Sequence, residues 1–230
     1  METSEEIRKR FLANADADSI AFGEKVIVPK RYRLCGLRAP VIRKFAKDIC
    51  KGDWRSYLKE TEDEYHEDMM LRALIITGAK MGTDERFVLI REFVPKMDNW
   101  AMCDVFFSDF KVTKDNAKEV WDFVLPYLDT GMEFQMRFAV SAMLGHFINE
   151  EYFEEVLKRI DSLKDNFYYV RMAVAWCVAE CFIRFPDATM IYLKNNTLNK
   201  FTFNKALSKI ADSYRIGDPV KDEIRAMRRR

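Results

Sequence analysis

The chain has 230 residues, 33% of them charged and 49% hydrophobic, with a formal net charge of +1. This composition excludes an intrinsically disordered chain and a polybasic nucleic-acid tail, so any nucleic-acid site must come from charge gathered on one face. The length fits one or two domains. Only 8 glycines and 6 prolines are present, and so few turn residues favour helices over a β-sandwich.

The termini and the cysteines give no sign of secretion. The charged start METSEEIRKR does not fit a signal peptide, and no stretch approaches the roughly 18 apolar residues of a membrane span. An odd number of widely spaced cysteines without a CxxC pair argues against disulfides and a zinc site. We therefore expect a cytoplasmic protein with reduced thiols and no membrane segment. The cysteines are Cys35, Cys50, Cys103, Cys177 and Cys181.

Helical signals follow one another along the chain. Four polar residues precede apolar stretches, and each can cap a helix by accepting a hydrogen bond from a free backbone N–H. Farther on, residues 134–148 and 168–183 carry apolar side chains at steps of three and four, the period of an amphipathic helix. We expect about twelve helices and no sheet. The capping residues are Asp53, Thr83, Asn99 and Thr113.

The helical pattern repeats. Phe134, Arg137, Ala139 and Val140 recur 34 residues later as an aromatic residue, an arginine, an alanine and a valine, and weaker copies start near residues 69 and 201. Stacked pairs of antiparallel helices of this length form an α-solenoid, which we expect to be one domain over residues 1–230. The repeated cation lies either along one edge of a concave surface or simply on a solvent-facing helix start. Its copies are Arg72, Arg137, Arg171 and Lys205.

Motifs for cofactors are missing from the sequence. Neither of the phosphate-binding patterns GxxxxGK[ST] and GxGxxG occurs. His66 and Glu67 begin like the zinc motif HExxH, but Met70 stands in place of the second histidine, and His146 is the only other histidine. A multi-histidine metal site and a histidine-based catalytic triad are therefore disfavoured, and we expect neither metal nor cofactor.

The sequence MDNWAMCD, residues 97–104, is the most informative segment. If Asn99 caps a helix, Trp100 and Asp104 lie one turn apart on one face. An aromatic ring beside a carboxylate suits a cationic ligand. The alternative is a packing role for Trp100 and a structural hydrogen-bonding role for Asp104. Trp176 replaces the Ala142 of the preceding repeat, and such local breaks of a pattern are typical of functional sites.

Together these motifs resemble the AlkD family of DNA alkylation-repair glycosylases, which are built from HEAT-like repeats. The resemblance covers nearly the whole chain. Its marks are LCGLRAP at 34–40, IRKFAK at 42–47, DNWxxxD at 98–104, MRFA at 136–139, AVAW at 173–176, FxxNKA at 201–206 and SYRI at 213–216.

The resemblance implies a right-handed, C-shaped solenoid of about six helical pairs that holds double-stranded DNA in a basic concave face. It implies a monomeric enzyme, nucleoid-associated when bound to DNA, that excises N3- and N7-alkylated purines without base flipping. Asp104 would be the catalytic carboxylate, Trp100 and Trp176 would contact the lesion's deoxyribose and backbone, and Arg137 would contact DNA near the site. The expected DNA-binding residues are Arg38, Arg43, Arg171, Lys205 and Lys209. Family enzymes often carry a DNA-facing aromatic in the first helical pair, where Phe22 and Tyr32 lie.

This chemistry is coherent for the residues present. Alkylation at N3 or N7 makes the purine a cationic leaving group, and a carboxylate can stabilise the sugar's oxocarbenium character or position water. Two alternatives use the same scaffold. One is a non-catalytic nucleic-acid binder that keeps the cations, and the other is a protein-binding α-solenoid.

Overall fold

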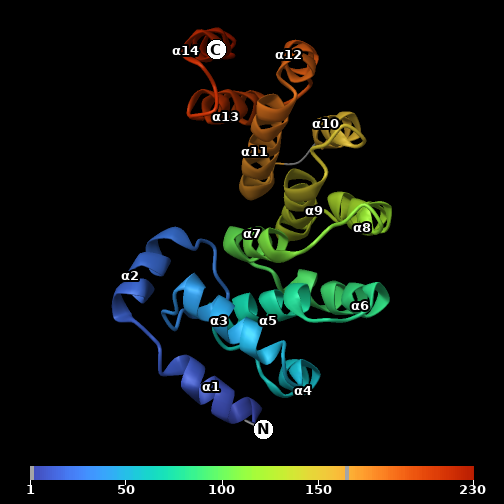
Figure 1. Cartoon of the computed structure of the whole chain (residues 1–230). Coiled ribbons are helices and arrows are strands. Elements are labelled where there is room, and N and C mark those ends of the chain that lie inside the picture. The colour runs from blue at the N-terminus through green and yellow to red at the C-terminus, as the bar shows by residue number, and fades with distance from the viewer. Residues whose placement is uncertain (1–2, 164–165) are drawn as a thin grey trace. The chain divides into compact units, whose positions relative to one another are not determined.

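The computed structural model describes residues 3–163 and 166–230 (Figure 1). These residues form helices and no β-strand, with one isolated bridge between Arg33 and Tyr65, so the expected all-α class is confirmed. The chain divides into two compact units, Met1–Thr113 and Lys114–Arg230, each of which is described by itself below. One domain over residues 1–230 stays a prediction.

The described residues contain fourteen α-helices, two more than about twelve expected from the period. The first unit contains α1 (Ser4–Leu12), α2 (Ala17–Val26), α3 (Ala39–Ile49), α4 (Trp54–Glu60), α5 (His66–Gly78), α6 (Thr83–Phe93), the 3-10 helix η1 (Val94–Lys96) and α7 (Trp100–Asp109). The second contains α8 (Ala117–Val124), the 3-10 helix η2 (Leu125–Asp129), α9 (Glu133–His146), α10 (Phe153–Ser162), α11 (Tyr168–Arg184), α12 (Pro186–Asn195), α13 (Lys200–Ala211) and α14 (Asp218–Ala226).

Two of the four predicted helix caps are confirmed. The side chains of Asp53 and Asn99 accept hydrogen bonds from backbone N–H groups in the first turns of α4 and α7. Thr83 is instead the first residue of α6, because the extended backbone ends one residue before it. Thr113 is not the N-cap residue of α8, because that helix begins only at Ala117 and its N-cap position is Asn116.

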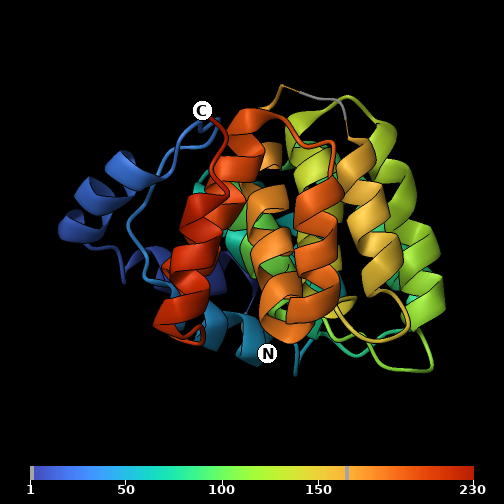
Figure 2. The same ribbon diagram turned by 90° about the horizontal axis from the view of Figure 1, so that it is seen from above.

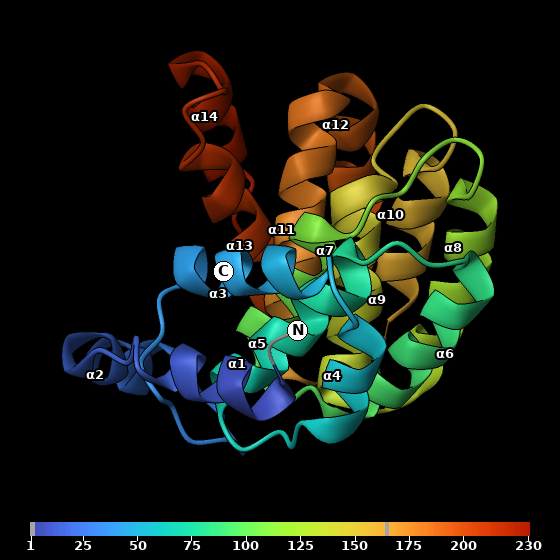
Figure 3. The ribbon, with the colours of Figure 1, turned by 60° about the horizontal axis from the view of Figure 1, so that its bottom comes forward.

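In the first unit, α3, α5 and α7 pack in series, and α2 lies at the periphery, joined to α3 by a loop (Figure 3). α5 lies between the other two, and its first turn is buried although it is polar. We call His66, Glu67 and Asp68 the α5 polar cluster; their exposed fractions are 4%, 4% and 6%. Buried polar groups need hydrogen-bond partners, and each of these residues bonds to a different segment.

Glu67 organises the loop that leads into α3. Its carboxylate accepts hydrogen bonds from the backbone N–H groups of Cys35 at 3.0 Å, Gly36 at 2.8 Å and Leu37 at 3.2 Å. Gly36 has a φ of 86°, and a Cβ there would lie 2.3 Å from the Asp16 carbonyl oxygen. Glycine is therefore required, and the LCGLRAP sequence is explained as a tight turn wrapped around a buried carboxylate.

Asp68 links the same turn to the N-terminal helix. Its carboxylate accepts from Arg8 Nη1 at 2.7 Å and from the backbone N–H of Tyr65 at 2.9 Å. Burial raises the pKa of the Asp68 carboxyl, and the bond from Arg8 opposes that rise. Arg8 is thus a structural residue that fastens α1 to α5.

In the second unit, α9, α11 and α13 lie side by side (Figure 1), while α10 and α12 run next to each other (Figure 2). The 34-residue repeat has a packing cause. Ala139 of α9 and Ala173 of α11 are essentially fully buried, and small side chains let neighbouring helices approach closely. The periodic stretches at 134–148 and 168–183 coincide with α9 and α11 to within one or two residues.

The repeated cation has different roles along the chain. Arg72 is half-buried, bonds to Asp63 at 2.6 Å and donates to the Leu58 carbonyl at 2.9 Å. Arg137 is 5% exposed and donates to the Tyr169 carbonyl at 2.8 Å. A solvent-facing helix start is therefore wrong for these two, because their guanidinium groups satisfy carbonyl oxygens of neighbouring segments.

The cysteines are free, as expected, and all but Cys50 are buried. Burial raises the pKa of the Cys35 and Cys50 thiols. The neighbouring Cys181 thiol and burial together raise the pKa of Cys177.

The substitution Glu67→Gln tests the loop interaction. The amide keeps the shape of the side chain but replaces one acceptor oxygen by an NH2 group, a donor that cannot bond to the backbone N–H groups of the loop. We expect the free energy of unfolding to fall by about 2 kcal/mol, on the scale of an unsatisfied buried bond to a charged group, measured by urea denaturation. Glu62→Gln, at an exposed position, is the control. Equal unfolding midpoints for both variants would contradict the prediction.

Candidate functional site

The start of α7 is built around Asn99. This residue is completely buried, and its Oδ1 accepts hydrogen bonds from the backbone N–H groups of Ala101 at 3.0 Å and Met102 at 3.2 Å. The cap fixes where α7 begins and therefore the direction in which its first turns point.

Trp100 and Asp104 occupy successive turns of α7, as the spacing predicts, and both are half-buried. The indole Nε1 of Trp100 donates a 2.9 Å hydrogen bond to the carbonyl of Val26, at the end of α2. Trp100 therefore fastens α2 to α7, which gives it the packing role weighed from the sequence. Its partial exposure leaves it accessible to a ligand as well.

A pocket of about 490 Å³ lies beside Trp100 within the first unit. Its walls come from α2, α3, α5, α7 and the loop before α3, and they are mainly apolar. The polar members are Asp18, Ser19, Arg38, His66 and Glu67. Phe22 also lines it and is 67% exposed. The first helical pair thus places an aromatic side chain close to Trp100, whereas Tyr32 lies half-buried in the following loop.

The two expected DNA-binding arginines of the first unit each contact a carboxylate. Arg38 bonds to Asp16 at 2.8 Å and is 69% exposed, while Arg43 bonds to Asp109 at 2.6 Å. Hydrogen bonds from Ser19 and Arg38 hold the pKa of the Asp16 carboxyl below its usual range. The exposed Arg38 pair contributes little to stability, so its guanidinium can exchange the carboxylate for a phosphate, whereas Arg43 and Asp109 are half-buried.

In the second unit, Trp176 is 39% exposed on α11. The Nζ of Lys209, from α13, lies 5.7 Å from the centre of its ring, within the range of a cation–π contact. One turn along α11, Glu180 bonds to Arg215 at 2.6 Å. Two cations from later in the sequence, Lys209 and Arg215, therefore contact α11 at or near Trp176.

The remaining predicted cations of this unit differ in accessibility. Arg171 on α11 and Lys205 on α13 are half-buried, and Arg171 also donates to the side chain of Asn166. Lys205 and Lys209 are four residues apart and share one face of α13. Arg137 is the exception, because it is buried against Tyr169.

The structure brings together some of the predicted residues and leaves others apart. Trp100 and Asp104 share α7, and Trp176 meets Lys209. Trp100 and Trp176 belong to different units, so their joint contact with one lesion stays a prediction, as does DNA contact by Arg137. The hydrogen-bond partner of Trp100 could not be predicted from the sequence. It is the backbone carbonyl of Val26, 74 residues away, and the pattern of side chains says nothing about a backbone group.

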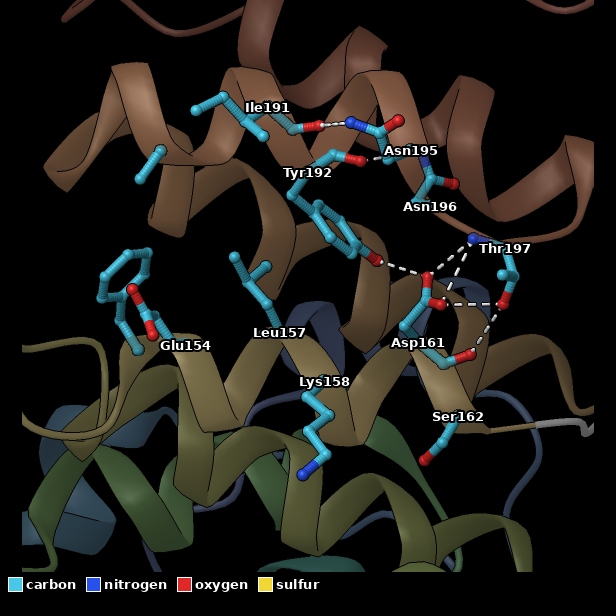
Figure 4. A pocket seen from close by; sticks show the side chains of 12 residues that line it. Glu154, Leu157, Lys158, Asp161, Ser162, Ile191, Tyr192, Asn195, Asn196 and Thr197 are labelled. Carbon is cyan, nitrogen blue, oxygen red and sulfur yellow. Dashed lines mark hydrogen bonds between the residues drawn. The ribbon is translucent and has the colours of Figure 1, made fainter.

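A second hollow, of about 500 Å³, lies between α10 and α12 (Figure 4). Asp161 dominates its polar side: its carboxylate accepts from the Tyr192 hydroxyl at 2.9 Å and from the hydroxyl of Thr197 at 2.8 Å. The Thr197 backbone N–H donates to it as well, at 3.0 Å. These bonds fasten the loop after α12 to α10, which gives Asp161 a structural role.

Within residues 3–163 and 166–230, no cluster of three or more histidine, cysteine or acidic side chains is arranged to bind a metal ion. Among the helices described, none has the length and apolar character to cross a membrane.

Comparison with known families decides the assignment. A family model described as DNA alkylation repair enzyme matches residues 7–210. The chain belongs to the DNA alkylation repair enzyme family. The match spans both units and includes every predicted site residue, and membership in the family implies DNA as the substrate. No curated protein matches the sequence.

If the cations of α11 and α13 contact DNA phosphates, the affinity for duplex DNA should fall as the salt concentration rises. We expect Arg171→Ala, Lys205→Ala and Lys209→Ala each to weaken binding regardless of DNA sequence and to lower the salt slope by about one. Fluorescence anisotropy of a labelled duplex at several salt concentrations measures both.

Lys158→Ala is the matched control for this series. It removes one cation from α10 in the same unit, where Lys158 pairs with Glu155. A salt slope that changes as much in the control as in the three variants would show that the DNA does not lie along α11 and α13.

Proposed function

We propose that the protein is a monofunctional DNA glycosylase that excises positively charged N3- and N7-alkylated purines from duplex DNA. The observation that carries the proposal is the pair Trp100 and Asp104, half-buried on adjacent turns of α7 and set by a fully buried cap, in a chain of this family. An aromatic face beside a carboxylate matches the charge of an alkylated nucleoside.

The chemistry asks little of the protein beyond electrostatics. The alkylated purine carries a positive charge and leaves as a neutral base when the glycosidic bond breaks, while positive charge develops on the deoxyribose. The carboxylate of Asp104 stabilises that charge or orients the attacking water. Trp100 contributes its π face to the cationic nucleoside, and Trp176 is proposed to contact the backbone next to the lesion.

Several finer features belong to the same proposal. The enzyme acts without base flipping, as a monomer, and associates with the nucleoid from the cytoplasm. The proposed fold is a right-handed solenoid of about six HEAT-like pairs, and the proposed DNA-binding residues of its basic concave face are Arg38, Arg43, Arg171, Lys205 and Lys209. DNA contact by Arg137 near the site belongs to the same proposal, and its bond to the Tyr169 carbonyl also links α9 to α11.

The direct test measures release of 7-methylguanine and 3-methyladenine from methylated duplex DNA. We expect the wild-type protein to release both bases and Asp104→Asn to do so at least about a hundredfold more slowly, the scale of losing one preorganised electrostatic group. The free energy of unfolding should change little because Asp104 is half-buried. DNA affinity should hold or rise slightly, since a carboxylate repels phosphates.

Asp122→Asn removes the same charge from α8, where Asp122 pairs with Lys118 on the surface, and should leave excision unchanged. Unchanged excision in Asp104→Asn would remove this carboxylate from the mechanism. Salt-sensitive DNA binding by a wild-type protein that releases no base would favour a non-catalytic DNA binder. A variant that unfolds would mark Asp104 as a structural residue.

A further inference from the structure

The hydrogen bonds of the Asn99 side chain determine its orientation. Its cap bonds to Ala101 and Met102 come from backbone N–H groups, which can only donate, so the end that faces them is the oxygen. The amide nitrogen therefore faces the other way, towards Asp98 Oδ1 at 2.7 Å and His66 Nδ1 at 3.2 Å.

This orientation fixes the tautomer of His66. The amide nitrogen offers two N–H donors and no acceptor, so Nδ1 of His66 must accept one of them. The ring is then neutral, with its proton on Nε2. Asp98 accepts the second donor and also accepts from the backbone N–H of Arg31. His66, Asp98 and Asn99 are 4%, 8% and 0% exposed, so these hydrogen bonds are largely shielded from solvent.

Protonation of His66 is incompatible with this arrangement. An imidazolium carries an N–H on Nδ1, which would face the N–H of Asn99, and the amide could recover a partner only by turning away from the cap of α7. The charged groups around the ring are Glu67 on α5, Asp98 before α7, and Arg38 and Asp18, which line the same pocket from α3 and α2. Burial lowers the pKa of His66, although Glu67 and Asp98 oppose that shift.

We propose that neutral His66 is a positioning residue: through Asn99 it holds the start of α7, and thereby the orientation of Trp100 and Asp104. The consequence for excision rests on the glycosylase function proposed above, whereas the consequence for the environment of Trp100 does not. The incomplete HExxH pattern disfavours a metal site at His66, and the proposed role of this histidine needs no metal.

The direction of the pH dependence follows from the lowered pKa. The unfolded chain binds a proton on His66 below about pH 6.5, whereas the folded protein resists it to lower pH. The stabilising contribution of the neutral ring is therefore complete above about pH 6.5 and is lost as the pH falls through the lower pKa of the folded state. The orientation of α7 should change as the pH falls through the pKa that His66 has in the folded protein.

Two substitutions separate acceptance of the hydrogen bond from titration. In His66→Asn, the amide oxygen can take the place of Nδ1 and accept from Asn99, but it does not titrate. His66→Leu keeps much of the volume and removes the acceptor. His146→Asn, on α9, is the matched control because His146 is the only other histidine. All variants are made in the full-length chain.

The first readout is the ¹H–¹⁵N resonance of the Trp100 indole, identified by its absence in Trp100→Phe and followed from pH 8 downwards. We expect it to shift in the wild type and in His146→Asn, with a midpoint below that of an unperturbed histidine, about 6.5. In His66→Asn the shift should be absent. A wild-type resonance that does not move, or a His66→Asn resonance that moves like the wild type, would overturn the proposal.

The second readout is the excision rate on methylated duplex DNA across the same pH range. We expect His66→Leu to lose about tenfold at pH 8, the scale of one unsatisfied buried donor, and His66→Asn to restore most of that loss and flatten the acid limb. Wild-type rates in His66→Leu would refute the positioning role. If His66→Leu does not fold, the comparison of wild type with His66→Asn decides. If the Trp100 resonance shifts with pH as expected but the wild-type protein excises no base, the positioning role is upheld and the glycosylase function is rejected.

Discussion

The burial of three consecutive polar side chains at the start of α5 constrains the whole first unit. His66 bonds to the cap of α7, Glu67 to the loop before α3, and Asp68 to Arg8 of α1. Because an unsatisfied buried polar group costs about 1–3 kcal/mol, more if it is charged, none of these segments can shift without breaking a bond. Trp100 and Asp104 are thus oriented by residues that lie more than thirty positions earlier in the chain.

In the second unit, arginine side chains and not buried carboxylates link neighbouring segments. There, guanidinium groups cross between helical layers and donate to backbone carbonyls: Arg137 to Tyr169 and Arg184 to Ile148. An arginine can satisfy carbonyls at a distance while its aliphatic stem packs among apolar neighbours. The cation that recurs every 34 residues therefore links adjacent repeats where it is buried, and the copies at Arg171 and Lys205 are more accessible.

The sequence predicts the local part of this structure well. Periodicity locates α9 and α11, and the capping side chain of Asn99 correctly places Trp100 and Asp104 on one face of α7. Both are properties of neighbouring residues. The predicted start of α8 was wrong. Several polar residues follow one another from Thr113 to Asn116, and the sequence does not show which of them occupies the N-cap position.

Long-range contacts were beyond the sequence for physical reasons. Two contacts depend on how the helices pack against each other: the hydrogen bond from Trp100 to the Val26 carbonyl and the cation–π contact between Lys209 and Trp176. The same repeat position holds a buried Arg137 and a more accessible Arg171, because burial depends on the neighbouring helix. The burial of the polar residues at 66–68 was also missed, because acidic side chains in a first helical turn are equally typical of an exposed helix start.

The burial of the cysteines matters for a protein of this family. Reagents that alkylate purines are electrophiles, and the thiolate is the most reactive nucleophile that a protein offers them. Cys35 and Cys177 are enclosed in the core, and their raised pKa keeps them as thiols at neutral pH. Buried thiols of this kind are poor targets for the electrophiles that damage DNA, whereas Cys50 is only half-buried.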